Sequence, residues 1–163
     1  MRIRDVKRAD VPQIARLYYE TVRRVNARDY SSEQIQAWAP RIYPDAFWQR
    51  RFRRYRVFVA EEADTVIGFV ELTTNGDIDC LYVHHAHQHQ GVGAALMARA
   101  ERQARRQHNP RLRADVSTTA QPFFRRMGFS VVRRQVRIYR GRPFNLAVME
   151  KRLPGTGRAP AEA

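Results

Sequence analysis

The sequence predicts an α/β domain in which short strands alternate with helices. Three observations indicate this class: a glycine-rich turn between an apolar strand and a helix, helices with regularly spaced apolar residues, and strands separated by short turns. A length of 163 residues fits one domain with a sizeable core. We expect the domain to cover residues 1–153 and the small, polar residues 154–163 to form a disordered tail.

The first third of the chain predicts one strand followed by helices. Apolar residues recur at helical spacing, and Asp10 with Gln13 fits the pattern of a capping box at the start of the first helix. The second helix is expected to stop before Pro40. The predicted elements are the strand Arg2–Val6 and three helices, from Asp10 to about Val25, from Ser31 or Ser32 to Trp38, and from Pro44 to about Arg54.

The remainder of the chain predicts six strands and two helices. Short connections at residues 62–64 and at Asn75-Gly76 favour turns between strands, and Gly128 is a typical residue just after a helix. The predicted strands are Val57–Glu61, Thr65–Thr73, Ile78–Val83, Leu112–Ser117, Phe129–Tyr139 and Phe144–Leu153, with Arg140 to Pro143 joining the last pair. The predicted helices are about Gly91–Gln107 and Ala120–Met127.

The most informative segment is the run Gln88-His89-Gln90-Gly91-Val92-Gly93 between the strand Ile78–Val83 and the helix that follows it. A tight turn that enters a helix leaves several backbone N–H groups unpaired and pointing the same way. With the positive end of the helix dipole, these donors favour a phosphate or pyrophosphate. Gly91 and Gly93 have no side chain to block the approach of a ligand to the backbone.

Two blocks in the same order resemble the GCN5-related N-acetyltransferase (GNAT) superfamily. The first is Ile78–Val83 with Gln88-x-x-Gly91-x-Gly93-x-x-Leu96, and the second runs from Ser117 to Gly128-Phe129. The stretch from Thr21 to Pro40 is similar to a bacterial YafP-like branch of that superfamily. The resemblance, from Ile3 to about Leu153, implies a GNAT fold with a mixed central β-sheet flanked by helices. It also implies acetyl-CoA as co-substrate and transfer of its acetyl group to an amine.

The resemblance also implies which residues bind the co-substrate and the acceptor. The backbone of Leu81, Tyr82 and Val83 would pair with the pantetheine arm, and a bulge there would direct an N–H group at the thioester carbonyl, where an oxyanion develops. Ser117 would lie near the cofactor, with Phe123 and Phe124 beside the thiol. The pyrophosphate would bind the amides of Gln88, His89, Gln90, Gly91, Val92, Gly93 and Ala94. Tyr30 and Trp38 are expected to contact the acceptor.

The catalytic residues are less directly indicated, because Phe124 stands where many relatives carry a tyrosine that protonates the departing thiolate. Water, or the hydroxyl of Tyr82 or Tyr139, could serve instead. A base is needed if the acceptor is a protonated amine, and we favour Asp79, then Glu71. The alternative is that Asp79 orders a local turn or pairs with an arginine.

Four of the five histidines lie between His84 and His89. We predict no metal site, because strand alternation would scatter these side chains and no carboxylate or cysteine pattern accompanies them. We expect them instead to line the mouth of the cofactor site. Cys80, the single cysteine, excludes an internal disulfide and is expected to pack within its strand.

The chain carries a formal net charge of +14, and only Lys7 and Lys151 of its 30 basic residues are lysines. The arginines are dispersed and no nucleic-acid-reading motif accompanies them, so we expect no specific nucleic-acid partner. So basic a chain would repel cationic protein substrates, which favours a small or anionic acceptor.

We expect a cytoplasmic protein with no membrane segment, and a homodimer is compatible with the family. Acetylation of a protein amine, or a degenerate domain that binds acetyl-CoA without turnover, are the alternatives.

Overall fold

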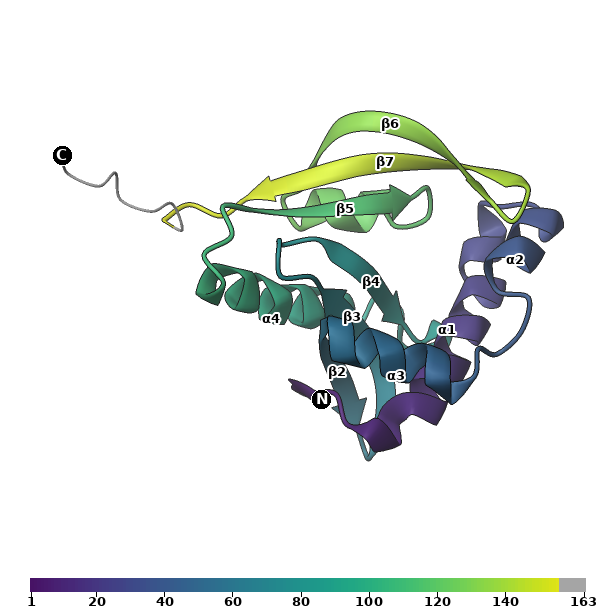
Figure 1. The fold of residues 1–163 in the computed structure, drawn as a ribbon, viewed down its shortest axis with the longest axis horizontal. Helices are drawn as coiled ribbons and strands as arrows, with labels where there is room; N and C mark the ends of the chain where they lie inside the picture. Colours follow the sequence, from purple (N-terminus) through teal and green to yellow (C-terminus); the bar gives the residue numbers. More distant parts are fainter. Residues whose placement is uncertain (156–163) are drawn as a thin grey trace.

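The structure, a computed structural model, describes residues 1–155, and its strands form two antiparallel sheets (Figure 1). The first sheet has the order β1 (Arg2–Asp5), β2 (Arg56–Glu62), β3 (Thr65–Leu72) and β4 (Ile78–Val83). The second has the order β5 (Arg111–Ser117), β7 (Arg142–Arg152) and β6 (Ser130–Tyr139).

A single parallel bridge between Asp77 and Arg113 joins the two sheets, and the Arg113 N–H donates to the Gly76 carbonyl oxygen at 3.0 Å. This parallel junction between antiparallel sheets agrees with the predicted mixed architecture. Beyond this bridge β4 and β5 diverge (Figure 1), and each is an edge strand of its own sheet. Two strand edges therefore face each other without pairing.

Helices cover both faces of the first sheet. The helices are α1 (Val11–Arg24), α2 (Ser32–Trp38), α3 (Asp45–Arg54), α4 (Val92–Arg106) and α5 (Gln121–Arg126), with short 3-10 turns η1 (Arg8–Asp10), η2 (Asn26–Arg28) and η3 (His85–His87). On one face, α1 and α3 pack Leu17 and Trp48 against Val57, Val59 and Phe69.

On the other face, α4 packs Leu96 and Met97 against Phe58 and Val70, and this cluster continues into the second sheet. Because both faces are covered, β2 and β3 are nearly continuous buried apolar runs rather than alternating ones.

Most element boundaries agree with prediction to within two residues, but the start of the first helix does not form a capping box. The Asp10 carboxylate accepts from the Arg4 guanidinium at 2.7 and 2.9 Å, and from the Lys7 N–H at 2.7 Å. Gln13 Oε1 instead accepts from the Val66 N–H at 2.8 Å. A charge-assisted bidentate pair is stronger than a neutral capping bond, so Arg4 decides where Asp10 points.

The last hairpin is also tighter than predicted, since β7 begins at Arg142 rather than at Phe144. Arg140 and Gly141 both have positive φ angles, +48° and +76°, as a two-residue type I′ turn requires. Pro143 is tolerated within the strand because it pairs only with β6, whereas the β5 ladder begins further on, at Leu146. Of the predicted tail, residues 156–163 lie outside the described residues.

Candidate functional site

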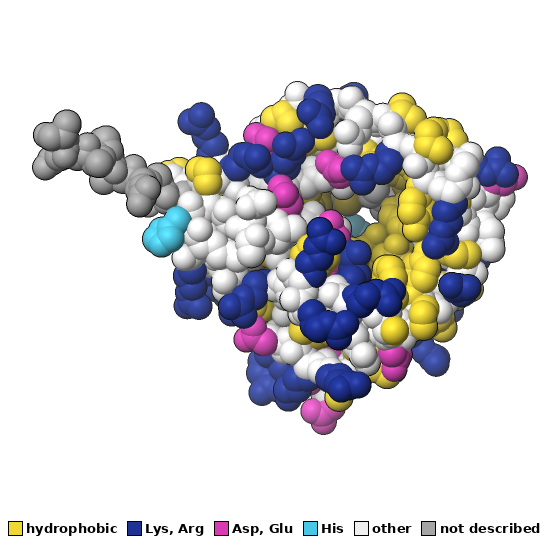
Figure 2. Space-filling view, viewed as in Figure 1, with side chains coloured by type: hydrophobic (Ala, Val, Ile, Leu, Met, Phe, Trp, Pro, Cys, Tyr) yellow, Lys and Arg dark blue, Asp and Glu magenta, His cyan; other side chains and the backbone are white. Residues whose placement is uncertain are grey.

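Two cavities flank the place where β4 and β5 diverge. The larger, of about 850 Å³, lies between the sheets, and Figure 2 shows it as a hollow with a hydrophobic interior and several basic side chains around its rim. Tyr18 from α1 and Trp38 from α2 line one side of this cavity, together with residues of β4, β5, β6 and β7. The smaller cavity, of about 360 Å³, lies at the start of α4 and includes Phe123 and Arg126.

The smaller cavity is built on residues Gln88 to Ala94, the 88–94 loop. His89 and Gly91 have left-handed φ angles of +57° and +82°, which turn the chain sharply from η3 into α4. None of the N–H groups of this loop is paired with an acceptor in the part of the chain that the structure describes. These donors stand at the N-terminus of a 15-residue helix, so they form an anion-binding concavity.

Glycine is required at the two positions Gly91 and Gly93 of the loop for different structural reasons. A Cβ on Gly91 would meet nothing within 4 Å, so its left-handed backbone, rather than space, is what requires glycine. A Cβ on Gly93 would lie 3.0 Å from the Phe123 ring, so glycine allows α4 to pack against α5. Arg126 adds a cation to the same cavity, although no pattern in the sequence distinguishes it from the other arginines.

Most of the predicted cofactor residues lie around these two cavities. The smaller cavity is lined by Val83, Gln88, His89, Gly91, Val92, Gly93, Ala94 and Phe123. The larger is lined by Leu81, Tyr82, Ser117 and Phe124. Gln90 lies outside both linings, and its side-chain amide donates to the Ala86 carbonyl oxygen at 3.4 Å. Only the backbone of Gln90 can therefore belong to the site.

The strand bulge is not where the sequence predicted it. Leu81, Tyr82 and Val83 pair regularly with β3, whereas the register shift places the extra residue at Asp79, between Ile78 and Cys80. The bulge occurs next to the junction of the sheets, where the end of β4 must bend toward Arg113. The outer edge of β4, with no strand beside it, faces the larger cavity.

Arg51 of α3 joins the two predicted bases in one cluster. Its guanidinium binds both oxygens of Glu71, at 2.6 to 3.1 Å, and also pairs with Asp79 Oδ2. The Glu71 side chain is fully buried and does not line the cavity, whereas that of Asp79 is 40% exposed and does. Burial raises the pKa of Glu71, which Arg51 opposes by favouring the ionised form.

Cys80 lies in the same cluster, with its sulfur 3.6 Å from Arg51 Nη2. Burial raises the pKa of the Cys80 thiol well above its ordinary value. The side chain lines the larger cavity as a protonated thiol, which is a poor nucleophile.

Aromatic rings form the wall of the larger cavity beside β4. The Tyr82 ring packs against Tyr18, with centroids 4.8 Å apart, and against Phe69. Burial raises the pKa of Tyr82 well above that of a free phenol, so its hydroxyl is protonated at neutral pH. Phe124 is buried between Phe123 and Phe129, and its ring lines the cavity without a polar group.

The two predicted acceptor residues have different positions. Trp38 lines the larger cavity, but Tyr30 does not. Tyr30 packs edge-on against Trp38, and its hydroxyl accepts from the Thr118 N–H at 2.9 Å. Tyr30 thus supports the wall from behind and ties η2 to the end of β5.

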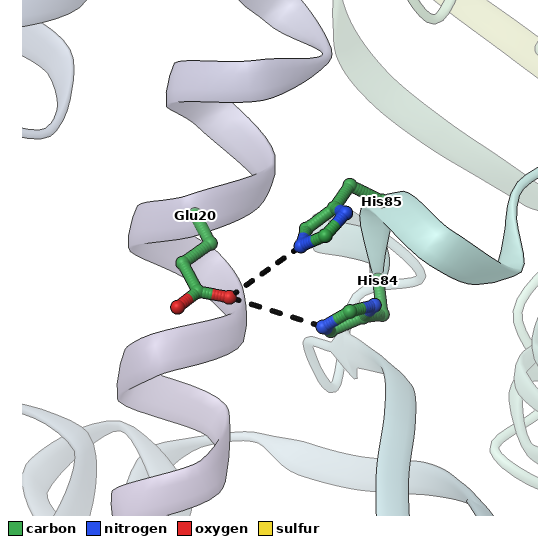
Figure 3. A group of neighbouring side chains, drawn as sticks. All are labelled: Glu20, His84 and His85. Atoms are coloured by element: carbon green, nitrogen blue, oxygen red, sulfur yellow. Dashed lines mark ion pairs between the residues drawn. The ribbon is translucent and has the colours of Figure 1, made fainter.

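The histidines do not scatter as predicted. His84 and His85 both point toward Glu20 of α1, with Nε2 to Oε2 distances of 3.8 and 3.6 Å (Figure 3). His84 Nδ1 accepts from the Ala86 N–H at 3.1 Å, so the proton of neutral His84 is on Nε2 and no lone pair there faces the carboxylate. His84 and His85 therefore lie against the Glu20 carboxylate, and of the four histidines only His87 and His89 line the smaller cavity.

The residues of the opposite wall of the larger cavity were not predicted from the sequence. Every second residue of β6 faces the cavity, namely Arg133, Gln135, Arg137 and Tyr139, alternating with the outward-facing Arg134, Val136 and Ile138. The alternation of polar and apolar residues is present in the sequence. On a strand, the apolar face is usually the one that points inward, but in β6 the polar face lines the cavity and the apolar face is exposed. Only the position of the second sheet shows which face meets the site.

No helix among residues 1–155 is long and apolar enough to cross a membrane.

Comparisons with known proteins agree with this geometry. The family described as "Acetyltransferase (GNAT) domain" matches residues 26–152. The uncharacterised N-acetyltransferase YafP of Escherichia coli K12 is 29% identical over 135 residues, which cover 83% of this chain and 85% of that protein.

Among solved structures, a GCN5-related N-acetyltransferase from Rhodopseudomonas palustris superposes with a TM-score of 0.89 at 27% identity, covering 93% of this chain and 95% of that one. YncA from Salmonella typhimurium, solved with its cofactor acetyl-CoA, gives a TM-score of 0.73 at 24% identity, covering 99% and 98%. The family match covers most of the chain and the folds coincide. The chain therefore belongs to the GNAT superfamily and is an acetyl-CoA-dependent N-acetyltransferase that acts on an amine acceptor.

Proposed function

We propose that the enzyme acetylates a small-molecule amine in the larger cavity, by direct attack while acetyl-CoA is also bound. The observation that carries this proposal is the half-open cleft of about 850 Å³, which meets the free edge of β4 and has Asp79 in its wall. A cleft between two sheets suits a small molecule better than a protein surface. We assign this activity to a domain of residues 1–153.

The residues present fit acetyl-CoA. The unpaired N–H groups of the 88–94 loop suit its pyrophosphate, and Arg126 adds a positive charge beside them. The backbone of Leu81 to Val83 offers a free strand edge to an amide-containing arm. Ser117, Phe123 and Phe124 lie where this arm would end. When bound, acetyl-CoA supplies a thioester as the acetyl donor.

Asp79 is our proposed base, with Glu71 behind it as a charge held by Arg51. The Asp79 carboxylate lines the cavity, whereas Glu71 is fully buried and bound on both oxygens. Asp79 can therefore take a proton from an amine, and Glu71 can set the position of Arg51. Arg51 spans both carboxylates, so the remaining alternative is that Asp79 mainly pairs with this arginine.

Tyr82 is our proposed proton donor to the leaving thiolate. Its phenol is protonated at neutral pH, and Phe124 cannot donate a proton. A thiol with a pKa of about 8.5 is a tolerable leaving group even without an acid, so Phe124 does not preclude turnover.

The enzymatic proposal is tested by the release of free CoA thiol from acetyl-CoA in the presence of a panel of small amines, with mass spectrometry of the products. We expect amine-dependent thiol release and an acetylated small molecule. Saturable acetyl-CoA binding without any thiol release would favour the degenerate alternative. Acetylation only of added peptides or proteins would favour a protein acceptor.

We also propose a cytoplasmic homodimer. A reducing compartment suits the free thiol of Cys80. The outer face of edge strand β6 exposes Val136 and Ile138 at 62% and 65%, which a second copy could cover. Sedimentation of the wild type and of a Val136→Lys, Ile138→Lys variant tests this; a wild type that sediments as a monomer would contradict it.

A further inference from the structure

The two walls of the larger cavity carry opposite charge. The first sheet contributes the carboxylate of Asp79, and Asp77 lies at the bridge to Arg113 that joins the two sheets. The second contributes four arginines, Arg111, Arg113, Arg133 and Arg137, with Asp115 as its only acidic lining residue. A cavity that is acidic on one side and basic on the other suits a ligand that itself carries both charges.

Two of the four arginines have no acidic partner among residues 1–155. Arg137 pairs with Asp115 at 2.7 Å, and Arg111 lies 3.7 Å from Glu150. Arg113 and Arg133 make no side-chain hydrogen bond or ion pair with any residue from 1 to 155. A guanidinium is a planar donor that matches a carboxylate, so these two positions are open for an anionic group.

The opposite wall is suited to the amine. Asp79 presents its carboxylate to the cavity, and within the described part of the chain only its Oδ2 is paired, with Arg51. The other oxygen is available to accept from an ammonium group or to remove its proton. Between the two charged walls lie the rings of Tyr18, Trp38 and Tyr82, which favour an apolar or aromatic side chain.

From these walls we infer that the acceptor is a zwitterionic amine, that is, an amine bearing a carboxylate, such as an amino acid with an apolar or aromatic side chain. This inference rests on the proposed function, since it assumes that the larger cavity holds the acceptor. The carboxylate binds Arg113 and Arg133, and the amine faces Asp79. In the reaction a C–N bond forms at the acetyl carbonyl and the C–S bond breaks. The ammonium nitrogen loses two protons, the first to Asp79 before the attack and the second to solvent as the amide forms, and the departing thiolate takes one proton from Tyr82 or water.

The test compares amino acids such as phenylalanine and leucine with the corresponding carboxamides, which have the same side chains but no carboxylate. The amine of the carboxamide is less basic, so deprotonation alone favours the carboxamide. We expect kcat/KM for the amino acid to be at least about 10-fold higher than for its amide, mainly through KM. Binding of the amino acid without acetyl-CoA, followed by intrinsic tryptophan fluorescence, gives a second readout, because Trp38 lines the cavity.

The variants are Arg113→Ala and Arg133→Ala, with Arg134→Ala as the matched control. Arg134 is adjacent on β6 but points to the outer face, away from the cavity. We expect each cavity variant to bring the amino acid-to-amide ratio toward one and to weaken amino acid binding, and the control to change neither. A preference for the amide, or a ratio that Arg113→Ala and Arg133→Ala leave unchanged, would overturn the inference while the acetyltransfer itself stands. If neither the amino acids nor the amides nor other small amines are acetylated, the proposed function fails as well.

Discussion

At the scale of single residues, the site depends on one arginine that holds two carboxylates in different environments. Arg51 binds fully buried Glu71 through two nitrogens and also contacts Asp79 at the cavity wall. Glu71 cannot reach an acceptor, but its charge requires Arg51 to stay in place. Asp79 is then oriented by the same guanidinium, so its position is fixed before a substrate arrives.

If Asp79 is the base, Asp79→Asn should lower kcat/KM at pH 7 by about 100-fold. The deficit should shrink as the pH rises, because the acceptor amine loses its proton without help. Thiol-release assays between neutral and alkaline pH measure this. Asp64→Asn, at an exposed turn residue with φ of +60° that asparagine tolerates, is the control. An unchanged kcat/KM in Asp79→Asn would assign Asp79 to the pairing of Arg51 alone.

Arg51→Met should destabilise the fold by about 3 to 5 kcal/mol, because it leaves the Glu71 charge buried and unpaired. Adding Glu71→Met should recover much of this loss, since no buried charge then remains. Urea unfolding of the two variants and of Arg54→Met, at an exposed position of the same helix, gives the comparison. A double variant that is as unstable as Arg51→Met would mean that packing, rather than charge, dominates at this position.

At the scale of elements, the start of α4 sets the affinity for the co-substrate. Gly91→Ala should cost about 1 kcal/mol of stability, because alanine disfavours a left-handed backbone. It should also weaken acetyl-CoA binding by at least about 10-fold, since relaxing this angle turns the N–H groups of the 88–94 loop away from each other. Calorimetric titration measures the affinity.

Gly141→Ala is the matched control for this prediction. Gly141 has a similar φ of +76° and nothing within 4 Å of its would-be Cβ, but it lies in the β6–β7 turn. We expect a similar loss of stability with no change in affinity. Equal affinities of the two variants would show that the 88–94 loop does not bind the co-substrate.

The pairing of β1 with β2 should make stability depend on acidic pH. Hydrogen bonds from Arg4 and Arg2 lower the pKa of Glu61 from 4.5 to about 2. Because the folded state favours the ionised form, this stabilisation is present above pH 4.5 and is lost as the pH falls toward 2. The stability difference between the wild type and Glu61→Gln should therefore narrow from pH 6 to pH 3 in thermal unfolding. A difference that stays constant would mean that Glu61 is equally ionised when unfolded.

At the scale of the whole molecule, the net charge of +14 comes from arginines that are dispersed along the chain rather than clustered in one segment. Unpaired arginines repel one another in the folded state, and salt screens this repulsion. We expect Tm at pH 7 to rise by a few degrees between roughly 10 and 300 mM NaCl. Calorimetry at several salt concentrations measures this, and a falling Tm would show that the ion pairs outweigh the repulsion.

Most strands and helices could be predicted from residues that are neighbours in the sequence. Ile78–Val83 is the predicted strand without change, and the helices begin and end near their predicted residues because capping residues, prolines and apolar spacing act over a few positions. The capping box at the start of α1 was wrong because Arg4 of β1 binds Asp10, and Val66, distant in sequence, binds Gln13. The bulge was misplaced for a similar reason, since β4 bends where it meets the second sheet.

The sequence by itself determined the family, the co-substrate and the loop that is expected to bind it, because a strand, a glycine turn and a helix are consecutive along the chain. The tertiary structure decided what lies opposite that loop. Arg51, Glu71 and Asp79 meet only because α3 packs beside β3 and β4, and Arg113 and Arg133 line the same cavity as Asp79 because the two sheets diverge after one bridge. Contacts between residues far apart in the chain depend on packing, which local patterns do not encode.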